Sequence, residues 1–247
     1  MKTLLAEAKG SASRFPGTLI DDLSITCRER SDHRCYLPGY LAVVSLQGWR
    51  QFVFERMRSE SAAKFFLECQ NDSLQSLALS LVGMWRPALQ SLRAALEGCL
   101  AAAYYSDHPV EARRWTTGSF SIGFSQLLKY FEEHPADLSA HARLNPLPAL
   151  EKEYTTLSQA VHGSRLSFRM STDGQIALSR NDGRLHSMWL TRHRSVLQAI
   201  NLLLCGLFRD DIRGNDHAEL RKTISLAVPR RLHEALRRHW GVRLYHA

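Results

Sequence analysis

The sequence lacks an apolar run long enough to cross a membrane. A membrane-spanning helix needs about 18 consecutive apolar residues, and the best candidate, residues 199–208, has about half that length. The start of the chain also lacks a signal-peptide core, because Glu7 and Lys9 interrupt the apolar residues there. We therefore expect a soluble, cytoplasmic protein with no membrane contact.

Cysteine is scarce and scattered, and no Cys-x-x-Cys motif occurs. The five cysteines are Cys27, Cys35, Cys69, Cys99 and Cys205. A disulfide framework would be dense and even-numbered, so reduced thiols are expected. Cys27, His33 and Cys35 are ligand types that zinc accepts, but they fall short of the four ligands of a structural site. We predict no metal and no cofactor.

The common catalytic motifs are missing. There is no glycine-rich phosphate loop, no G-x-S-x-G nucleophile elbow and no His-Glu-x-x-His metal motif. These absences argue against nucleotide hydrolysis and against hydrolase chemistry by the familiar routes.

What is present is the composition of a globular protein. Hydrophobic residues make up 45% of the 247 residues and charged residues 23%, which fits one large domain over residues 1–247. The spacing of apolar residues predicts helices over 40–58, 61–82, 85–105, 109–115, 120–131, 149–161, 185–208, 216–225 and 229–240. Loops are expected at residues 11–17 and 28–39, and Ser61 is the expected cap of the second helix.

One β signal stands out. Two alternating runs, 166–170 and 175–179, flank Ser171-Thr172-Asp173-Gly174, and Asp-Gly between such runs indicates a hairpin. The expected fold is an all-α bundle with one small β-hairpin around residues 165–180.

The chain is basic, and the excess is concentrated at its end. Lysine and arginine number 32 against 24 acidic residues, a formal charge of +8. Residues 226–247 are expected to form a basic C-terminal helix, in which Glu234 is the single acid. Its arginines are Arg230, Arg231, Arg237, Arg238 and Arg243. Such a stripe can bind nucleic-acid phosphates, or it can be a solvated face that pairs with an acidic partner.

The most apolar predicted helix, 85–105, carries one pair of opposite charges. Arg93 and Glu97 lie one turn apart, so they can neutralise each other or line a polar pocket inside the bundle. Tyr154, Ser158 and His162 are spaced by four and share one face of another predicted helix, which Gly163 ends. Tyr154 and Ser158 are therefore candidate pocket residues with Glu97.

His162 has two interpretations. It can cap the end of its own helix, or it can act with Arg165 in cleaving RNA without a metal. In that chemistry the histidine transfers a proton and the arginine stabilises charge on the phosphate.

Two stretches, Ser91-Leu-Arg93-Ala-Ala-Leu-Glu97 and Leu157-Ser158-Gln-Ala-Val-His162-Gly-Ser164, resemble the helical HEPN-like and abortive-infection-type proteins of bacterial phage defence. The ribonucleolytic members carry an arginine, a polar residue and a histidine on one helix at a dimer interface. Arg180-Asn-Asp-Gly-Arg-Leu-His186 matches those letters, although its Asp-Gly is a turn signal.

Three functions follow as expectations. The first is a helical accessory or regulatory subunit of an anti-phage defence system, which binds a protein partner or a second copy and can also bind nucleic acid. The alternative is a metal-independent HEPN-type ribonuclease toxin, with His162 or His186 as acid and base and Arg93, Arg165 or Arg180 as phosphate ligand. The third is a small-molecule sensor whose pocket contains Arg93, Glu97 and Tyr154.

Overall fold

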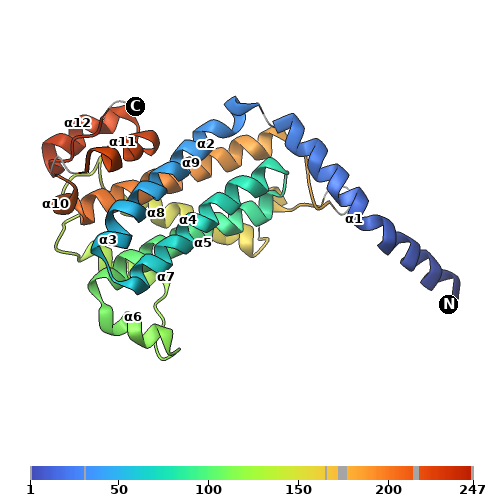
Figure 1. The fold of residues 1–247 in the computed structure, drawn as a ribbon, viewed down its shortest axis with the longest axis horizontal. Coiled ribbons are helices and arrows are strands. Elements are labelled where there is room, and N and C mark those ends of the chain that lie inside the picture. The colour runs from blue at the N-terminus through green and yellow to red at the C-terminus, as the bar shows by residue number, and fades with distance from the viewer. Residues whose placement is uncertain (1, 31, 165, 172–176, 214–216, 246–247) are drawn as a thin grey trace.

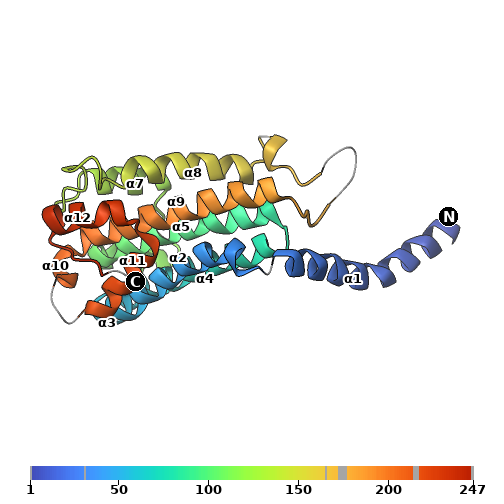
Figure 2. The ribbon, with the colours of Figure 1, turned by 90° about the horizontal axis from the view of Figure 1, so that it is seen from above.

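Five long helices form the body of the molecule in the computed structural model, which describes every residue except 1, 31, 165, 172–176, 214–216 and 246–247 (Figures 1 and 2). They are α2 (His33–Trp49), α4 (Glu60–Leu81), α5 (Trp85–Asp107), α8 (Leu147–Val161) and α9 (Gly183–Leu207). The described residues contain no strand, so the all-α prediction is confirmed.

Shorter helices gather at one end of this body, and α1 (Lys2–Arg30) projects from the other (Figure 1). The short elements are the π-helical stretch Arg50–Phe54, α3 (Glu55–Met57), α6 (Pro109–Thr116), α7 (Phe124–Glu132), α10 (Arg209–Ile212), α11 (Ala218–Ala227) and α12 (His233–Ala235). Among the described residues, no helix combines the length and the apolar character that a bilayer crossing requires.

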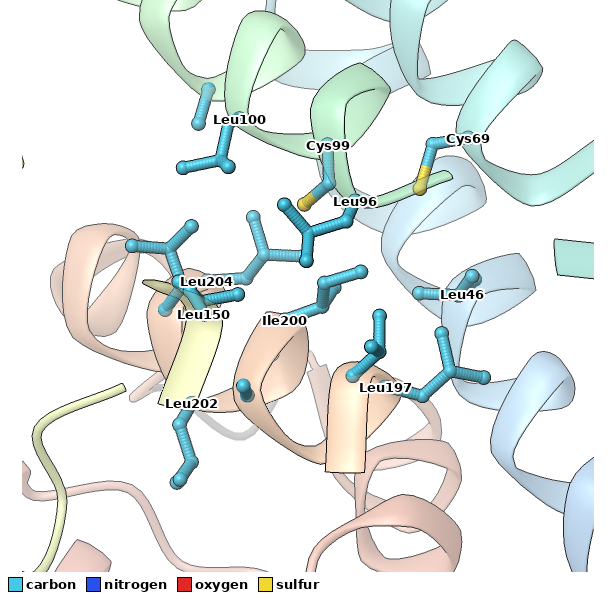
Figure 3. Packing of buried hydrophobic residues seen from close by; sticks show 14 of the residues in the cluster. Leu46, Cys69, Leu96, Cys99, Leu100, Leu150, Leu197, Ile200, Leu202 and Leu204 are labelled. Carbon is cyan, nitrogen blue, oxygen red and sulfur yellow. The ribbon is translucent and has the colours of Figure 1, made fainter. Parts of the chain in front are cut away.

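The core forms where the apolar faces of α2, α4, α5, α8 and α9 meet (Figure 3). Leu92, Leu96 and Leu100 of α5 follow a four-residue repeat and are fully buried, as the apolar character of this segment predicts. Leu197 and Ile200 of α9 pack from the opposite side (Figure 3). The central position expected for residues 85–105 is therefore what the structure shows.

A set of polar contacts inside the core fixes how the helices align. The indole N–H of Trp189 donates to Ser76 Oγ at 3.0 Å, and Ser76 donates to the carbonyl of Ala88 at 2.7 Å. Asn201 accepts from the Trp49 indole N–H at 2.9 Å and donates to Ser45 Oγ at 2.8 Å. Since a buried polar atom without a partner is costly, each pairing favours one register of the helices.

The loop predicted at 11–17 is wrong, and the one predicted at 28–39 is reduced to the short break between α1 and α2. Residues 11–17 lie inside α1, which continues through Pro16, and α2 already begins at His33. An interior proline removes one backbone donor and crowds the preceding turn, yet α1 continues past Pro16. The cap of α4 is Ser59 instead of Ser61, because Ser59 Oγ accepts from the Ala62 backbone N–H at 3.2 Å.

The small β-hairpin is not confirmed. Leu166–Phe168, in the first expected strand, forms a 3₁₀ turn, and residues 172–176 of the turn lie outside the described part of the chain. In the second expected strand, Ser179 Oγ donates to the carbonyl of Val82 at 2.6 Å. Residues 177–182 thus pack on the α4–α5 turn. The local sequence pattern does not encode this tertiary contact.

Residues 226–247 do not form one regular helix. A 3₁₀ turn (Arg230–Leu232), the single turn α12 and a π-helical turn (Leu236–Trp240) follow one another, and Gly241 ends them at φ 68°. The left-handed conformation at Gly241 is one that glycine adopts without a Cβ penalty. The arginines are therefore distributed around a short, irregular helical segment and do not form a single stripe.

Candidate functional site

The structure brings together three of the predicted pocket residues. One Nη of Arg93 donates to Glu97 Oε1 at 3.1 Å and to the hydroxyl of Tyr154 at 2.8 Å. The guanidinium also lies 4.8 Å from the centre of the Tyr154 ring, and that ring stacks on Phe124 with centroids 3.6 Å apart. Arg93 therefore ties α5 to α8 through a hydrogen bond and a cation–π contact with Tyr154, while its ion pair with Glu97 lies within α5.

Ser158 lies one turn beyond Tyr154 on α8. Its Oγ is buried without a hydrogen-bond partner among the described residues. It does not join the contacts that Arg93 makes with Glu97 and Tyr154.

His162 ends α8, and its backbone N–H donates to the carbonyl of Ser158 at 3.0 Å. Arg86 of α5 donates from Nε to the Ala160 carbonyl at 3.0 Å and from Nη2 to the Val161 carbonyl at 2.7 Å. The last carbonyls of a helix lack their regular i+4 donors, and a cation is favoured at a helix C-terminus. Sequence reasoning missed Arg86, because only the packing of α5 against α8 reveals its partners.

Arg93 and His162 are not brought together. Arg93 contacts α8 at Tyr154, and eight residues of helix at 1.5 Å per residue separate Tyr154 from His162 by about 12 Å. The arginine at the level of His162 is Arg86. Arg165, the other expected partner of His162, lies outside the described residues.

Arg180 and His186 do not share a helix. Asp182 caps α9, accepting from the backbone N–H groups of Arg184 and Leu185, so Arg180 precedes the helix and His186 lies in its first turn. The His186 ring is buried, with its centre 5.8 Å from the Trp85 ring and 5.8 Å from that of Trp189. The Arg180 backbone carbonyl accepts from the Trp85 indole N–H at 2.8 Å. These contacts give the segment a clear packing role.

The C-terminal arginines fall into different environments. Arg237 and Arg238 both pair with Glu234, at 2.8 Å and 3.2 Å. The hydrogen bond from Arg237 is the main cause that lowers the pKa of Glu234 to about 2. Arg230 and Arg231 lie in the 3₁₀ turn, and Arg243 follows Gly241.

A pocket of about 300 Å³ lies between the C-terminal segment and residues 140–144. Sequence reasoning did not single out residues 140–144. The rings of His141 and His239 lie against each other in this pocket, with their centres 3.7 Å apart and their planes tilted by 34°. Arg143, Arg231 and Arg238 line it together with one acid, Glu234, and an Arg143 Nη donates to the Arg231 carbonyl at 3.4 Å. We call these residues, His141, Arg143, Arg231, Arg238 and His239, the basic pocket.

The electrostatics of the basic pocket favour an anion. Loss of solvent, the neighbouring His141 and the charge of Arg238 together lower the pKa of His239. The cationic neighbours of His239 disfavour its protonation, and a bound anion would relieve that repulsion. The pocket can therefore bind an anion and take up a proton as it does so.

Metal ligands do not cluster in the part of the chain that the structure describes: no group of three or more His, Cys, Asp or Glu side chains could hold an ion there. Cys27 is a free, half-buried thiol. The side chains of His33 and Cys35 lie outside the described part, so the arrangement of this trio is not defined.

Comparison with known proteins gives no relative from which a function could be transferred. No protein-family model, no curated protein and no solved structure matches this chain.

Proposed function

We propose that this protein is a helical accessory subunit that binds nucleic-acid phosphates in the basic pocket. The observation that carries the proposal is the close contact of the His141 and His239 rings among Arg143, Arg231 and Arg238. Two segments about ninety residues apart in the chain both contribute cationic side chains to it. A guanidinium recognises a phosphate with two parallel hydrogen bonds, which makes arginine the residue best suited to such a site.

The pocket offers more than charge. Glu234 holds Arg238 through an ion pair at 3.2 Å. The ion pair limits the rotamers of Arg238 and so orients its guanidinium toward a ligand. The exposed His239 ring provides a flat face on which a base can stack, as in other sites for single-stranded nucleic acid. These features favour single-stranded RNA over an isolated phosphate.

The accessory role and the defence setting rest on the resemblance of residues 91–97 and 157–164 to HEPN-like proteins. A catalytic role draws less support, since Arg93 lies about two helical turns from the level of His162 and His186 is buried against tryptophan. In this proposal the protein binds RNA without cutting it.

Fluorescence anisotropy with a labelled single-stranded RNA tests the proposal. Arg143→Glu with Arg231→Glu should weaken binding by about ten-fold or more, because each charge-assisted contact contributes about 1.5–3 kcal/mol. The matched control, Arg113→Glu with Arg169→Glu, makes the same change in net charge at two exposed arginines outside the pocket and should bind nearly as the wild type does. Equal losses of affinity in both variants would show that only the net charge matters, and would reject the basic pocket as the binding site.

Two further readouts use the same samples. RNA recovered after incubation in EDTA should be intact, and its cleavage would favour the ribonuclease alternative. Affinity should rise as the pH falls from 8 to 5.5, because a phosphate bound beside the His141–His239 pair favours protonation of His239, so that protonation and binding favour each other. The charged groups facing this pair are Arg143, Arg231, Glu234 and Arg238. A His141→Ala, His239→Ala variant should lose most of that pH dependence.

A further inference from the structure

The helix α1 leaves the body of the molecule and continues into solvent (Figures 1 and 2). Its last third is docked: Thr26 and Arg30 are buried, and Leu19 and Leu23 are half-buried. Thr26 Oγ1 lies 3.3 Å from Ser179 Oγ, while an Arg30 Nη donates to Asn181 Oδ1 at 2.7 Å. Apart from half-buried Gly10, residues 3–18 are all exposed.

The exposed part of α1 carries an apolar stripe on the same helix face that is docked further along the helix. Leu5, Ala8, Ala12, Phe15 and Leu19 follow the 3-4-3-4 spacing of a coiled-coil seam. Leu23, Thr26 and Arg30 continue the same face at spacings of four, three and four. The seam is therefore a direct extension of a surface that already packs against protein.

This stretch needs a partner in order to stay helical. Isolated helices shorter than about 12–15 residues are marginal in water even when they are rich in alanine. The exposed stretch 3–18 is little longer than that, and it contains Gly10, Pro16 and Gly17. Leu5 is 58% exposed and Phe15 is 54% exposed. Large apolar side chains exposed along one seam indicate a surface that a binding partner covers.

We propose that α1 pairs antiparallel with α1 of a second copy of this chain. In an antiparallel register centred between Ser13 and Arg14, Ala12 faces Phe15 of the second copy and Ala8 faces Leu19. Small side chains then meet large ones in both layers, as close packing requires. A parallel register would instead set Phe15 on Phe15 and alanine on alanine, and it would bring the two bundles to the same end. The pairing is independent of the proposed RNA binding.

Light scattering coupled to size exclusion measures the mass. The wild type should elute with twice the monomer mass of 28.1 kDa at micromolar concentration, and Phe15→Glu should restore the monomer mass. Ile25→Glu is the matched control: Ile25 is equally exposed at 54% but lies off the seam, so this variant should stay dimeric. A monomeric wild type, or a dimer that survives Phe15→Glu, would overturn the proposal.

Disulfide trapping tests the orientation. A mixture of chains carrying Ala8→Cys with chains carrying Leu19→Cys should form a cross-linked dimer on oxidation, above the background of the wild type's own thiols. Ala8→Cys alone should not. A disulfide between two Ala8→Cys chains would instead require the parallel arrangement and would contradict the register.

Discussion

His193 lies on the inner face of α9 with its imidazole fully buried beside the Trp189 ring, 4.7 Å away between centroids. Burial lowers the pKa of His193 to about 4, and the neighbouring Ser73 backbone offsets only part of that effect. The core therefore holds this histidine in its neutral form, and its charging is linked to unfolding.

Acid should weaken the fold through this one residue. The unfolded histidine has a pKa near 6.5, so between about pH 6.5 and 4 the unfolded chain binds a proton that the folded chain excludes. Stability is then lost as the pH falls through that window, by roughly 2–3 kcal/mol at pH 4.5. Urea unfolding at pH 7.5 and pH 4.5 measures the difference.

His193→Leu cannot take up the proton, so it should lose much less stability between the two pH values than the wild type loses. His162→Ala, which changes an exposed histidine at the end of α8, should behave like the wild type. If His193→Leu lost as much as the wild type, the acid sensitivity would have another source.

At the residue scale, sequence reasoning succeeded where partners lie on one helix. The Arg93–Glu97 pair follows from its spacing of four. Arg86, which reaches the end of α8, and His141, which contacts His239, have partners 74 and 98 positions away. No local periodicity encodes such distances, so the basic pocket could be predicted only in its C-terminal half.

Helices are the elements that the sequence predicts best, wherever their apolar face is buried. The segment expected at 85–105 is α5 (Trp85–Asp107), and the one expected at 149–161 is α8 (Leu147–Val161). The failures occur where burial is slight. Residues 11–17 contain proline and glycine and read as a loop, yet they lie in the exposed helix α1. Local propensity alone is a weak guide there, because no core contact of the segment selects its conformation.

The contact between α2 and α11 depends on one glycine. A Cβ at Gly48 would lie 2.1 Å from Thr223 Oγ1 and 3.3 Å from Leu220 Cδ1. Gly48→Ala should therefore destabilise the protein by roughly 1–3 kcal/mol, despite the higher helix propensity of alanine, which is worth about 1 kcal/mol. Chemical denaturation gives this value.

Thr223→Ala removes the closest clashing atom, so the double variant should recover part of the loss caused by Gly48→Ala. The two substitutions should therefore be non-additive, as expected for residues in contact. An additive pair, or a Gly48→Ala protein more stable than the wild type, would show that α2 and α11 pack less closely than described.

At the scale of the whole molecule, the two proposed surfaces lie at opposite ends. The C-terminal helices stand at the end away from α1 (Figure 1), so antiparallel pairing of α1 would leave both basic pockets open and far apart. Each subunit then binds RNA through its own pocket, and a monomeric Phe15→Glu variant should keep the affinity of a single site.

The salt dependence of RNA binding tests the central claim most directly, because its slope reports the number of phosphate contacts. On a single strand the slope of log affinity against log salt should become shallower by about 0.7 for each contact removed. We predict a slope shallower by about 1.4 in Arg143→Glu with Arg231→Glu, and an unchanged slope in Arg113→Glu with Arg169→Glu and in Phe15→Glu. The same slope and affinity in the pocket variant as in the wild type would contradict the account.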